Sequence, residues 1–217
     1  GGTDMKLLAV NGSPRKRWNT ATLLEKALEG AASRGAETEL VHLYDLDFKG
    51  CVSCFACKTP GGASVGRCPI EDALKRVLED GPRVDALLVG SPVYLGSVTG
   101  ETQSFLERLI FPYLTYTDPP TTLFPRKIRT GFVYTMGAGE EMARERAMEA
   151  NSPAHRFLLE LVFGSARELW SYDTWQFEDY SKVYAPLFDV EKKARRRAEV
   201  FPEDCRRAFE LGAGLMS

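Results

Sequence analysis

The chain has 217 residues, of which 44% are hydrophobic and 27% are charged. These fractions are typical of a globular domain and exclude a disordered or fibrous chain, and the length predicts one domain. Lysine and arginine number 28 against 30 aspartate and glutamate residues, so the net charge of −2 gives no electrostatic footprint for nucleic acid or an anionic membrane. We therefore expect a small-molecule partner, with no nucleic acid and no membrane bound.

No stretch of the sequence approaches the run of about 18 apolar residues that a membrane-spanning helix needs. The start of the chain also lacks the basic and then apolar segments of a signal peptide. Both observations predict a cytoplasmic protein. Residues 1–4 precede Met5 and match no structural pattern, so we expect an expression remnant there and a single domain over residues 5–217.

The first elements are a buried strand and a helix. Residues 7–10 form a short apolar run that stops at Asn11-Gly12-Ser13-Pro14, which is typical of a strand ending in a turn. Apolar residues at helical spacing follow from Leu24 to Ala31, with Asn19 or Thr20 as the expected cap and Gly35 just past the end. A second strand is predicted over residues 39–43.

Strands and helices continue to alternate along the rest of the chain. The predicted elements are a helix over residues 70–78, a strand over 84–89, a helix from Thr99, a strand over 130–135, a helix from Glu140, a weaker strand over 166–172, an irregular region over 173–186 and a closing helix over 203–211. Such alternation predicts an α/β doubly wound sandwich with a five-stranded parallel sheet and helices on both faces. Ligands of such sheets bind outside the carboxyl ends of the strands, where three small polar loops are expected.

The first of these loops runs from Gly12 to Thr20 and is suited to bind a phosphate. It combines hydroxyl groups, an amide and three cations with the start of a helix, where free N–H groups and the helix dipole attract anions. Neither the Gly-x-x-x-x-Gly-Lys-[Ser/Thr] loop nor the Gly-x-Gly-x-x-Gly fingerprint is present. An ordinary polar turn is the alternative interpretation.

The second loop, residues 91–100, contains one aromatic residue and no side chain that titrates near neutral pH. A flat, neutral heterocycle would suit it, because Tyr94 can stack on a ring and Gly96 permits a close backbone approach. The alternative is that Tyr94 packs in the core.

The segments GSPRKRWNTATLL and SPVYLGSVTGETQSFLERL resemble the NADPH-dependent FMN reductase family of flavodoxin-like proteins, and the similarity covers most of residues 6–139 in motif order. The resemblance implies FMN as cofactor, with its phosphate near the first loop, its isoalloxazine ring along the second and its pyrimidine side near residues 135–139. Trp18 departs from the family pattern, and it either points outward or covers the phosphate. The implied FMN-binding residues are Ser13, Arg15, Asn19, Thr20, Thr22, Pro92, Val93, Tyr94, Leu95, Gly96, Ser97, Thr135, Gly137 and Gly139.

Four of the five cysteines fall in one insert, residues 51–68: Cys51, Cys54, Cys57 and Cys68. Such clustering favours a metal or redox centre over structural disulfides in a reducing compartment. The Cys-x2-Cys-x2-Cys-x10-Cys pattern resembles the iron–sulfur flavoprotein branch, apart from a somewhat longer last gap, and this resemblance implies a 4Fe-4S cluster. A zinc site and a set of free or disulfide-linked thiols remain alternatives. The fifth, Cys205, is expected to pack.

The resulting hypothesis is an FMN-dependent oxidoreductase that transfers electrons between NAD(P)H, or a ferredoxin-like carrier, and a small acceptor. A cluster-free NAD(P)H:flavin or quinone reductase and a non-catalytic FMN-binding electron carrier are the alternatives. Aromatic residues in the loop over 111–124 favour a homodimer or homotetramer, although a lid or burial within the domain would also explain them. His42 and His155 are interpreted as structural, and residues 195–197, three arginines, as a solvated helical face.

Overall fold

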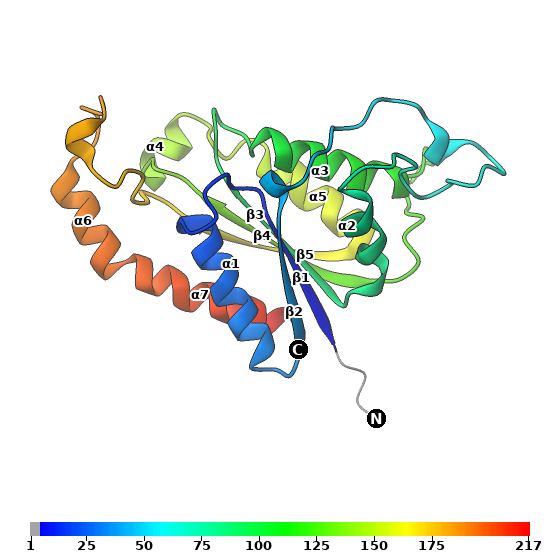
Figure 1. Ribbon diagram of the computed structural model, residues 1–217, viewed down its shortest axis with the longest axis horizontal. Helices are drawn as coiled ribbons and strands as arrows, with labels where there is room; N and C mark the ends of the chain where they lie inside the picture. The colour runs from blue at the N-terminus through cyan, green and yellow to red at the C-terminus, as the bar shows by residue number, and fades with distance from the viewer. Residues whose placement is uncertain (1–4) are drawn as a thin grey trace.

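The computed structural model describes residues 5–217 and contains one sheet of five strands (Figure 1). All neighbouring strands are parallel, and their spatial order is β2-β1-β3-β4-β5, the order of flavodoxin-like proteins. The prediction of a five-stranded parallel α/β fold is therefore confirmed. The expected expression remnant, residues 1–4, lies outside the described residues. The strands are β1 (Lys6–Asn11), β2 (Glu37–His42), β3 (Ala86–Pro92), β4 (Ile128–Thr135) and β5 (Gly164–Ser171).

Helices cover both faces of this sheet, as Figure 1 shows. One apolar core joins the sheet to α1 and α7, and α6 leads into α7. The other core joins the opposite face to α2, α3 and α5. The short helix α4 follows β4 at the carboxyl edge of the sheet. The helices are α1 (Asn19–Ala32), α2 (Lys75–Asp80), α3 (Gly100–Ile110), α4 (Glu140–Glu145), α5 (Ser152–Phe163), α6 (Val190–Glu199) and α7 (Phe201–Leu215).

Helices α1 and α7 pack unusually closely. A Cβ atom on Gly212 would lie 1.7 Å from the carbonyl oxygen of Ala27, so only glycine permits this approach. The apolar side of α1, with Leu23, Leu24 and Ala27, is fully buried against the sheet and α7. The C-terminal helix therefore fixes α1, whose first turn borders the predicted phosphate loop.

Several boundaries differ from those predicted. Helix α1 begins at Asn19 with Trp18 at the N-cap position, so neither Asn19 nor Thr20 caps it. The helix predicted from Ile70 becomes α-helical only at Lys75, whereas Thr99 does cap α3 by accepting a hydrogen bond from the backbone N–H of residue 102. Strand β3 continues to Pro92, which brings residues of the second loop into register with β4.

The expectation that residues 195–197 form a solvated face is wrong for Arg196, whereas Arg195 and Arg197 are exposed. Arg196 pairs with the buried carboxylate of Asp204, which also accepts a 2.6 Å hydrogen bond from the Ser171 hydroxyl. Arg197 donates to the side-chain oxygen of Asn19 at 2.7 Å. The ion pair and the hydrogen bonds tie α6 to α7, β5 and the first turn of α1, because α6 directs these two long side chains toward the neighbouring elements.

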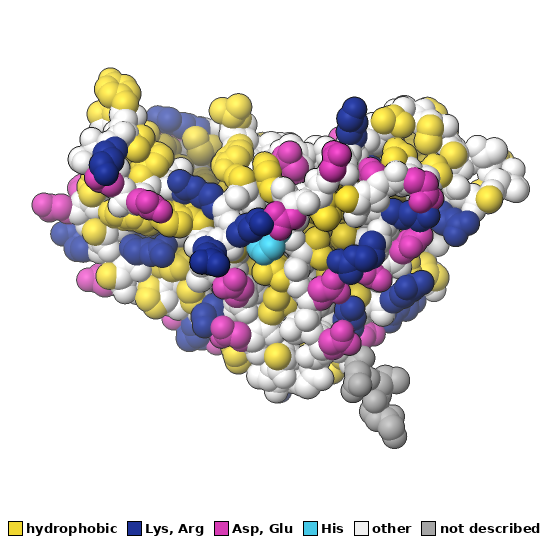
Figure 2. Space-filling model, in the orientation of Figure 1, with side chains coloured by type: hydrophobic (Ala, Val, Ile, Leu, Met, Phe, Trp, Pro, Cys, Tyr) yellow, Lys and Arg dark blue, Asp and Glu magenta, His cyan; other side chains and the backbone are white. Residues whose placement is uncertain are grey.

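The two ends of the loop after α3 are buried within the chain, whereas its middle, residues 116–121, is exposed. Tyr113 and Phe124 belong to the core and meet edge to face with their ring centres 4.9 Å apart, while Tyr116 remains 81% exposed. Cys205 packs beside the α1–α7 core as expected. No helix in residues 5–217 combines the length and the apolar character required to cross a membrane. On the face in Figure 2, positive and negative side chains are mixed.

Candidate functional site

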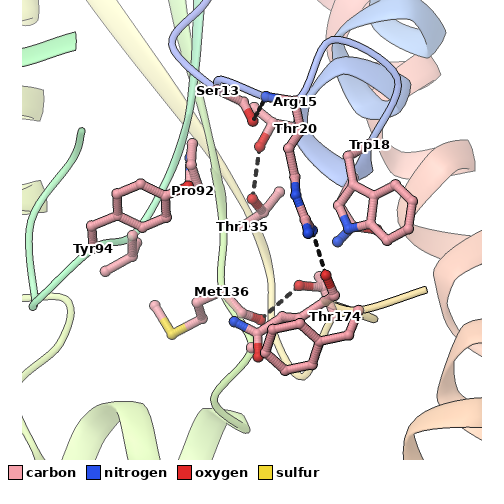
Figure 3. A pocket seen from close by; sticks show the side chains of 14 residues that line it. Ser13, Arg15, Trp18, Thr20, Pro92, Tyr94, Thr135, Met136 and Thr174 are labelled. Atoms are coloured by element: carbon pink, nitrogen blue, oxygen red, sulfur yellow. Dashed lines mark hydrogen bonds between the residues drawn. The ribbon is translucent and has the colours of Figure 1, made fainter. Parts of the chain in front are cut away.

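A cavity of about 260 Å³ lies where the loops after β1, β3 and β4 meet at the carboxyl edge of the sheet (Figure 3). A fourth segment, after β5, closes its remaining side. Nine of the fourteen residues predicted to bind a cofactor line it, so the structure brings the three predicted loops together at one cavity. The lining residues are Ser13, Arg15, Trp18, Asn19, Thr20, Pro92, Val93, Tyr94, Thr135, Met136, Gly137, Thr174, Gln176 and Phe177.

The first loop is held by its own side chains. The buried amide of Asn11 accepts a hydrogen bond from the backbone N–H of Ser13 at 3.0 Å, and the Ser13 hydroxyl accepts one from the backbone N–H of Arg15 at 3.1 Å. The hydroxyl groups of Thr20 and Thr135 lie 2.8 Å apart and link the start of α1 to the end of β4. The loop therefore presents hydroxyl groups and a helix N-terminus to the cavity, an arrangement that suits an anion.

Trp18 and Arg15 span the cavity from the first loop to the segment after β5. The Arg15 guanidinium lies 4.8 Å from the centre of the Trp18 ring and donates to the carbonyl of Gln176 (Figure 3). The Trp18 indole N–H and the Asn19 amide both donate to the carbonyl of Trp175, at 2.9 and 2.7 Å. Trp18 thus points across the first loop to the segment after β5 and not outward.

The second loop contains a tight turn at the edge of the cavity. Tyr94 and Ser97 exchange backbone hydrogen bonds of 2.7 and 3.0 Å, and both residues between them, Leu95 and Gly96, have left-handed backbones. The Tyr94 side chain is 47% exposed and lines the cavity, so its alternative assignment to the core is wrong. Left-handed geometry at a non-glycine residue such as Leu95 is strained, so the surrounding turn must hold it in place.

The third loop contains a glycine, Gly137, at a position where any side chain would clash with a neighbouring amide. A Cβ atom on Gly137 would lie 2.2 Å from the side-chain amide of Gln176, so this glycine makes room for that amide. Within residues 5–217 the amide oxygen of Gln176 is buried and has no hydrogen-bond partner. Behind the loop, the buried ammonium of Lys193 donates to the Gly137 carbonyl at 2.8 Å and to the Asp173 carboxylate at 2.7 Å.

Five of the predicted residues do not line this cavity. The Thr22 hydroxyl donates to the backbone carbonyl of Trp18 at 2.9 Å and braces the first helical turn. Leu95 and Gly96 line an adjacent cavity, Ser97 lies at a small crevice beside it, and Gly139 is the N-cap of α4. A sequence motif gives the order of residues along the chain but not the direction of their side chains. It therefore cannot separate these five residues from those that line the cavity.

Conversely, sequence reasoning missed the contribution of the segment after β5. Thr174, Gln176 and Phe177 line the cavity, and the Thr174 hydroxyl donates to the Met136 carbonyl at 3.0 Å. The sequence predicts only an irregular region there. Its one signal was a pair of aromatic residues, Trp175 and Phe177, in a stretch without periodicity.

The cysteine-rich insert projects away from the sheet as the cyan loop in Figure 1. Cys51 and Cys54 are exposed and Cys57 is buried, and burial raises the pKa of the Cys57 thiol. The residues on both sides of Cys54, Ser53 and Phe55, have left-handed backbones. Within residues 5–217 no three Cys, His, Asp or Glu side chains are placed to hold one metal ion, so this conformation does not gather the four thiols.

The base of the insert is held by one buried arginine on α3. The guanidinium of Arg108 is 1% exposed and pairs with both oxygens of the Asp72 carboxylate. Its Nε donates to the Cys68 sulfur at 3.3 Å, and its remaining donors reach the carbonyls of Lys49 and Ile70, at 3.0 and 3.3 Å. Arg108 therefore joins the two ends of the insert.

The sequence matches the NADPH-dependent FMN reductase family over residues 5–151. It is 42% identical over 104 residues to an iron-sulfur flavoprotein from Archaeoglobus fulgidus, with 48% of each chain covered. An iron-sulfur flavoprotein from Methanocaldococcus jannaschii is 30% identical over 155 residues, which are 71% of this chain and 72% of that protein. The chain thus matches about half the length of the first relative and nearly three quarters of the second.

Solved structures share the fold at low sequence identity. An NAD(P)H:quinone oxidoreductase from Methanothermobacter marburgensis superimposes with a TM-score of 0.69 at 16% identity, over 99% of this chain and 98% of that one. An azoreductase from Bacillus anthracis gives 0.67 at 14% identity, over 97% and 99%. These likenesses show the fold alone. Together with the family match, the sequence relatives show that the chain belongs to the NADPH-dependent FMN reductase family, in its iron–sulfur flavoprotein branch.

Proposed function

We propose that the chain is an FMN-dependent oxidoreductase of the iron–sulfur flavoprotein type, which transfers electrons between NAD(P)H or a ferredoxin-like carrier and a small acceptor. The observation that carries the proposal is the cavity at the carboxyl edge of the sheet, where an anion-binding loop and an aromatic loop face each other. Names of relatives and neighbours support it, because they include iron-sulfur flavoproteins and a quinone oxidoreductase.

The residues of the cavity fit FMN at both ends. Ser13, Arg15 and Thr20, with the N-terminus of α1, supply donors for the phosphate. At the opposite end, the unpartnered amide oxygen of Gln176 suits a ligand with an N–H donor, and the pyrimidine edge of a flavin has one. Tyr94 supplies an aromatic ring beside the flavin. When bound, FMN supplies the redox chemistry, and these side chains hold and orient it.

The phosphate assignment is tested by replacing two hydroxyl groups. In the double variant Ser13→Ala with Thr20→Val we expect FMN to bind more weakly, because each hydrogen bond to a charged acceptor contributes about 1.5–3 kcal/mol. Riboflavin lacks the phosphate and should bind the variant and the wild type about equally. Quenching of flavin fluorescence on titration measures both affinities.

Ser33→Ala serves as the matched control. The Ser33 hydroxyl donates to a backbone carbonyl at the other end of α1, far along the chain from the phosphate loop, so FMN affinity should stay at the wild-type value. An unchanged FMN affinity in the double variant would show that the phosphate assignment is wrong.

We further propose that the four cysteines of the insert hold a 4Fe-4S cluster. Four thiols are the ligand set of such a cluster, and Cys51 and Cys54 lie exposed on a loop whose backbone turns sharply at Ser53 and Phe55. Metal sites of this kind form as the metal binds, so the ligands need not be gathered beforehand. A cluster-free NAD(P)H:flavin or quinone reductase is the alternative, favoured by the separation of the thiols in this conformation.

One anaerobic preparation distinguishes these alternatives. We expect iron and acid-labile sulfide each to approach about four per chain, because a 4Fe-4S cluster contains those atoms. Cys68→Ser should lose the cluster and retain FMN, whereas Cys205→Ser, which changes a thiol between α7 and α1, should retain both. An iron-free wild type that is replete with zinc would contradict the cluster.

Turnover separates an enzyme from a carrier. We expect steady NAD(P)H oxidation when a small acceptor is added to the FMN-loaded protein. Stoichiometric flavin reduction without turnover, under the same conditions, would instead indicate a non-catalytic electron carrier.

A further inference from the structure

Beside the proposed FMN cavity lies a second cavity of about 350 Å³. The two share the walls formed by Val93, Met136, Gly137 and Gln176. A molecule in the second cavity would therefore lie next to the cofactor that the first cavity takes under the proposed function. Its volume is near the lower end of the range of about 300–1,000 Å³ for ligand pockets, and it suits a molecule of two or three rings better than a dinucleotide.

The lining of this cavity is apolar and adaptable. Three methionines, at positions 136, 142 and 148, and the ring of Phe188 line it. Thioethers make favourable contacts with aromatic rings and adjust to ligands of different outline. The ammonium of Lys193 lies 4.4 Å from the centre of the Phe188 ring, which fixes that ring in the wall. These groups favour a flat aromatic ligand.

Two features of the rim indicate that the cavity takes a ligand from solvent. Leu95 is fully exposed at the tip of the strained turn and lines the cavity, so its apolar side chain is free to contact a bound ligand. Arg146 is the one charged side chain in the lining. In residues 5–217 the nearby Arg144 pairs with Glu140, whereas Arg146 makes no ion pair.

We propose that this second cavity binds a flat aromatic substrate that carries one anionic group, and that Arg146 is the residue that selects the anion. The proposal rests on the proposed function, since it names the substrate class of the same flavin site. The methionines and Phe188 contact the rings, and the guanidinium contacts the anionic substituent. A neutral aromatic molecule of the same outline binds more weakly.

The test compares naphthalene-2-sulfonate with the neutral naphthalene-2-sulfonamide, two redox-inert probes of the same ring system. Calorimetric titration of the FMN-loaded wild type is expected to show about fivefold tighter binding of the sulfonate at low salt, as fits a partly exposed ion pair. Arg146→Gln should abolish this preference and Arg146→Lys should keep most of it. Arg144→Gln, two residues earlier in α4, should leave it at the wild-type value.

A sulfonate preference that persists in Arg146→Gln would overturn the proposal. So would a preference lost equally in Arg144→Gln, which would indicate a general effect of positive charge. Titration of each variant with FMN beforehand keeps the two proposals separate. If the wild type binds no FMN, the proposed function fails, and the same pair of probes titrated into the FMN-free chain still decides whether Arg146 selects the anion.

Discussion

At the scale of single residues, His155 shows how a buried ring couples stability to pH. Its ring lies parallel to that of Phe132, with ring centres 5.7 Å apart, and its Nδ1 lies 3.2 Å from the Tyr134 hydroxyl. Burial lowers the pKa of this imidazole. The folded protein therefore keeps His155 neutral at pH values where the unfolded chain already protonates it. This agrees with the structural role inferred from its position in the sequence.

The free energy of unfolding should consequently decrease as the pH falls below about 6.5, where the unfolded chain takes up the proton first. The loss continues until the pH reaches the lowered pKa of the folded state, with a slope of at most about 1.4 kcal/mol per pH unit. Urea unfolding of the wild type and of His155→Phe between about pH 7 and pH 5 measures it. The variant should have the smaller slope.

His155→Phe also leaves the Tyr134 hydroxyl without its partner, and this lowers stability at every pH by a similar amount. The slope, and not the absolute stability, is therefore the informative quantity. Burial also raises the pKa of Glu168, and this carboxyl contributes to the pH dependence of both proteins alike. If the free energy of unfolding falls with pH at the same slope in both proteins, His155 does not cause the pH dependence of stability.

At the scale of structural elements, Arg108 decides whether the cysteine-rich insert has a fixed base. All five of its N–H groups are used, and they reach residues on both sides of the insert. Removing one partner of a buried ion pair leaves the other charge uncompensated, at a cost of about 3–5 kcal/mol. Arg108→Met should therefore lose about this much stability in urea unfolding. Arg108→Lys should lose nearly as much, because a single ammonium cannot reproduce the two parallel hydrogen bonds that the guanidinium donates to the Asp72 carboxylate.

Arg83→Met is the control for this prediction. Arg83 is 76% exposed, and its guanidinium lies as far as 3.8 Å from the carboxylate of Asp80, so this ion pair is weak. The stability of this variant should stay within about 0.5 kcal/mol of the wild type. Trypsin gives a second measurement, because Lys58 and Arg67 lie inside the insert and should be cleaved faster in Arg108→Met than in Arg83→Met. Equal cleavage rates and equal stabilities in the two variants would contradict the role given to Arg108.

At the scale of the whole molecule, we expect the apolar surface left over after folding to mediate self-association. Tyr113 and Phe124 are buried, so the surface available to a partner is smaller than the sequence implied. What remains is an aromatic cluster of Phe55, Phe111 and Tyr116, in which adjacent ring centres lie 6.1 and 6.4 Å apart. Phe55 and Tyr116 are 51% and 81% exposed.

We expect light scattering to give two or four times the 24.2 kDa mass of one chain. The double variant Phe55→Ser with Tyr116→Ser should shift the mass toward one chain, because it removes most of the exposed aromatic area of the cluster. Phe157→Ser, which changes an exposed ring on α5 that is 57% accessible, is the control and should keep the wild-type mass. A wild type with bound FMN and the mass of a single chain would refute self-association.

The amino-acid sequence by itself determined the fold and three of the four walls of the site. Parallel strands buried on both faces require continuous apolar runs, and helices that cover them require a 3.6-residue period, so both leave a local signal in the chain. The loops after β1, β3 and β4 end such runs with small polar residues. Because the carboxyl ends of parallel strands share one edge, the meeting of these loops at one edge of the sheet follows from the sequence pattern.

Only the tertiary structure decided the fourth wall, the direction of Trp18, the second cavity and the use of Arg108. Trp18 and Trp175 are 157 residues apart in the chain and meet through one hydrogen bond, and Arg108 meets Cys68 across 40 residues. Such contacts depend on how helices and loops pack and on single side-chain directions, and they produce no periodicity or spacing in the sequence. Local patterns therefore specify the elements, whereas long-range packing specifies which side chains face the same cavity.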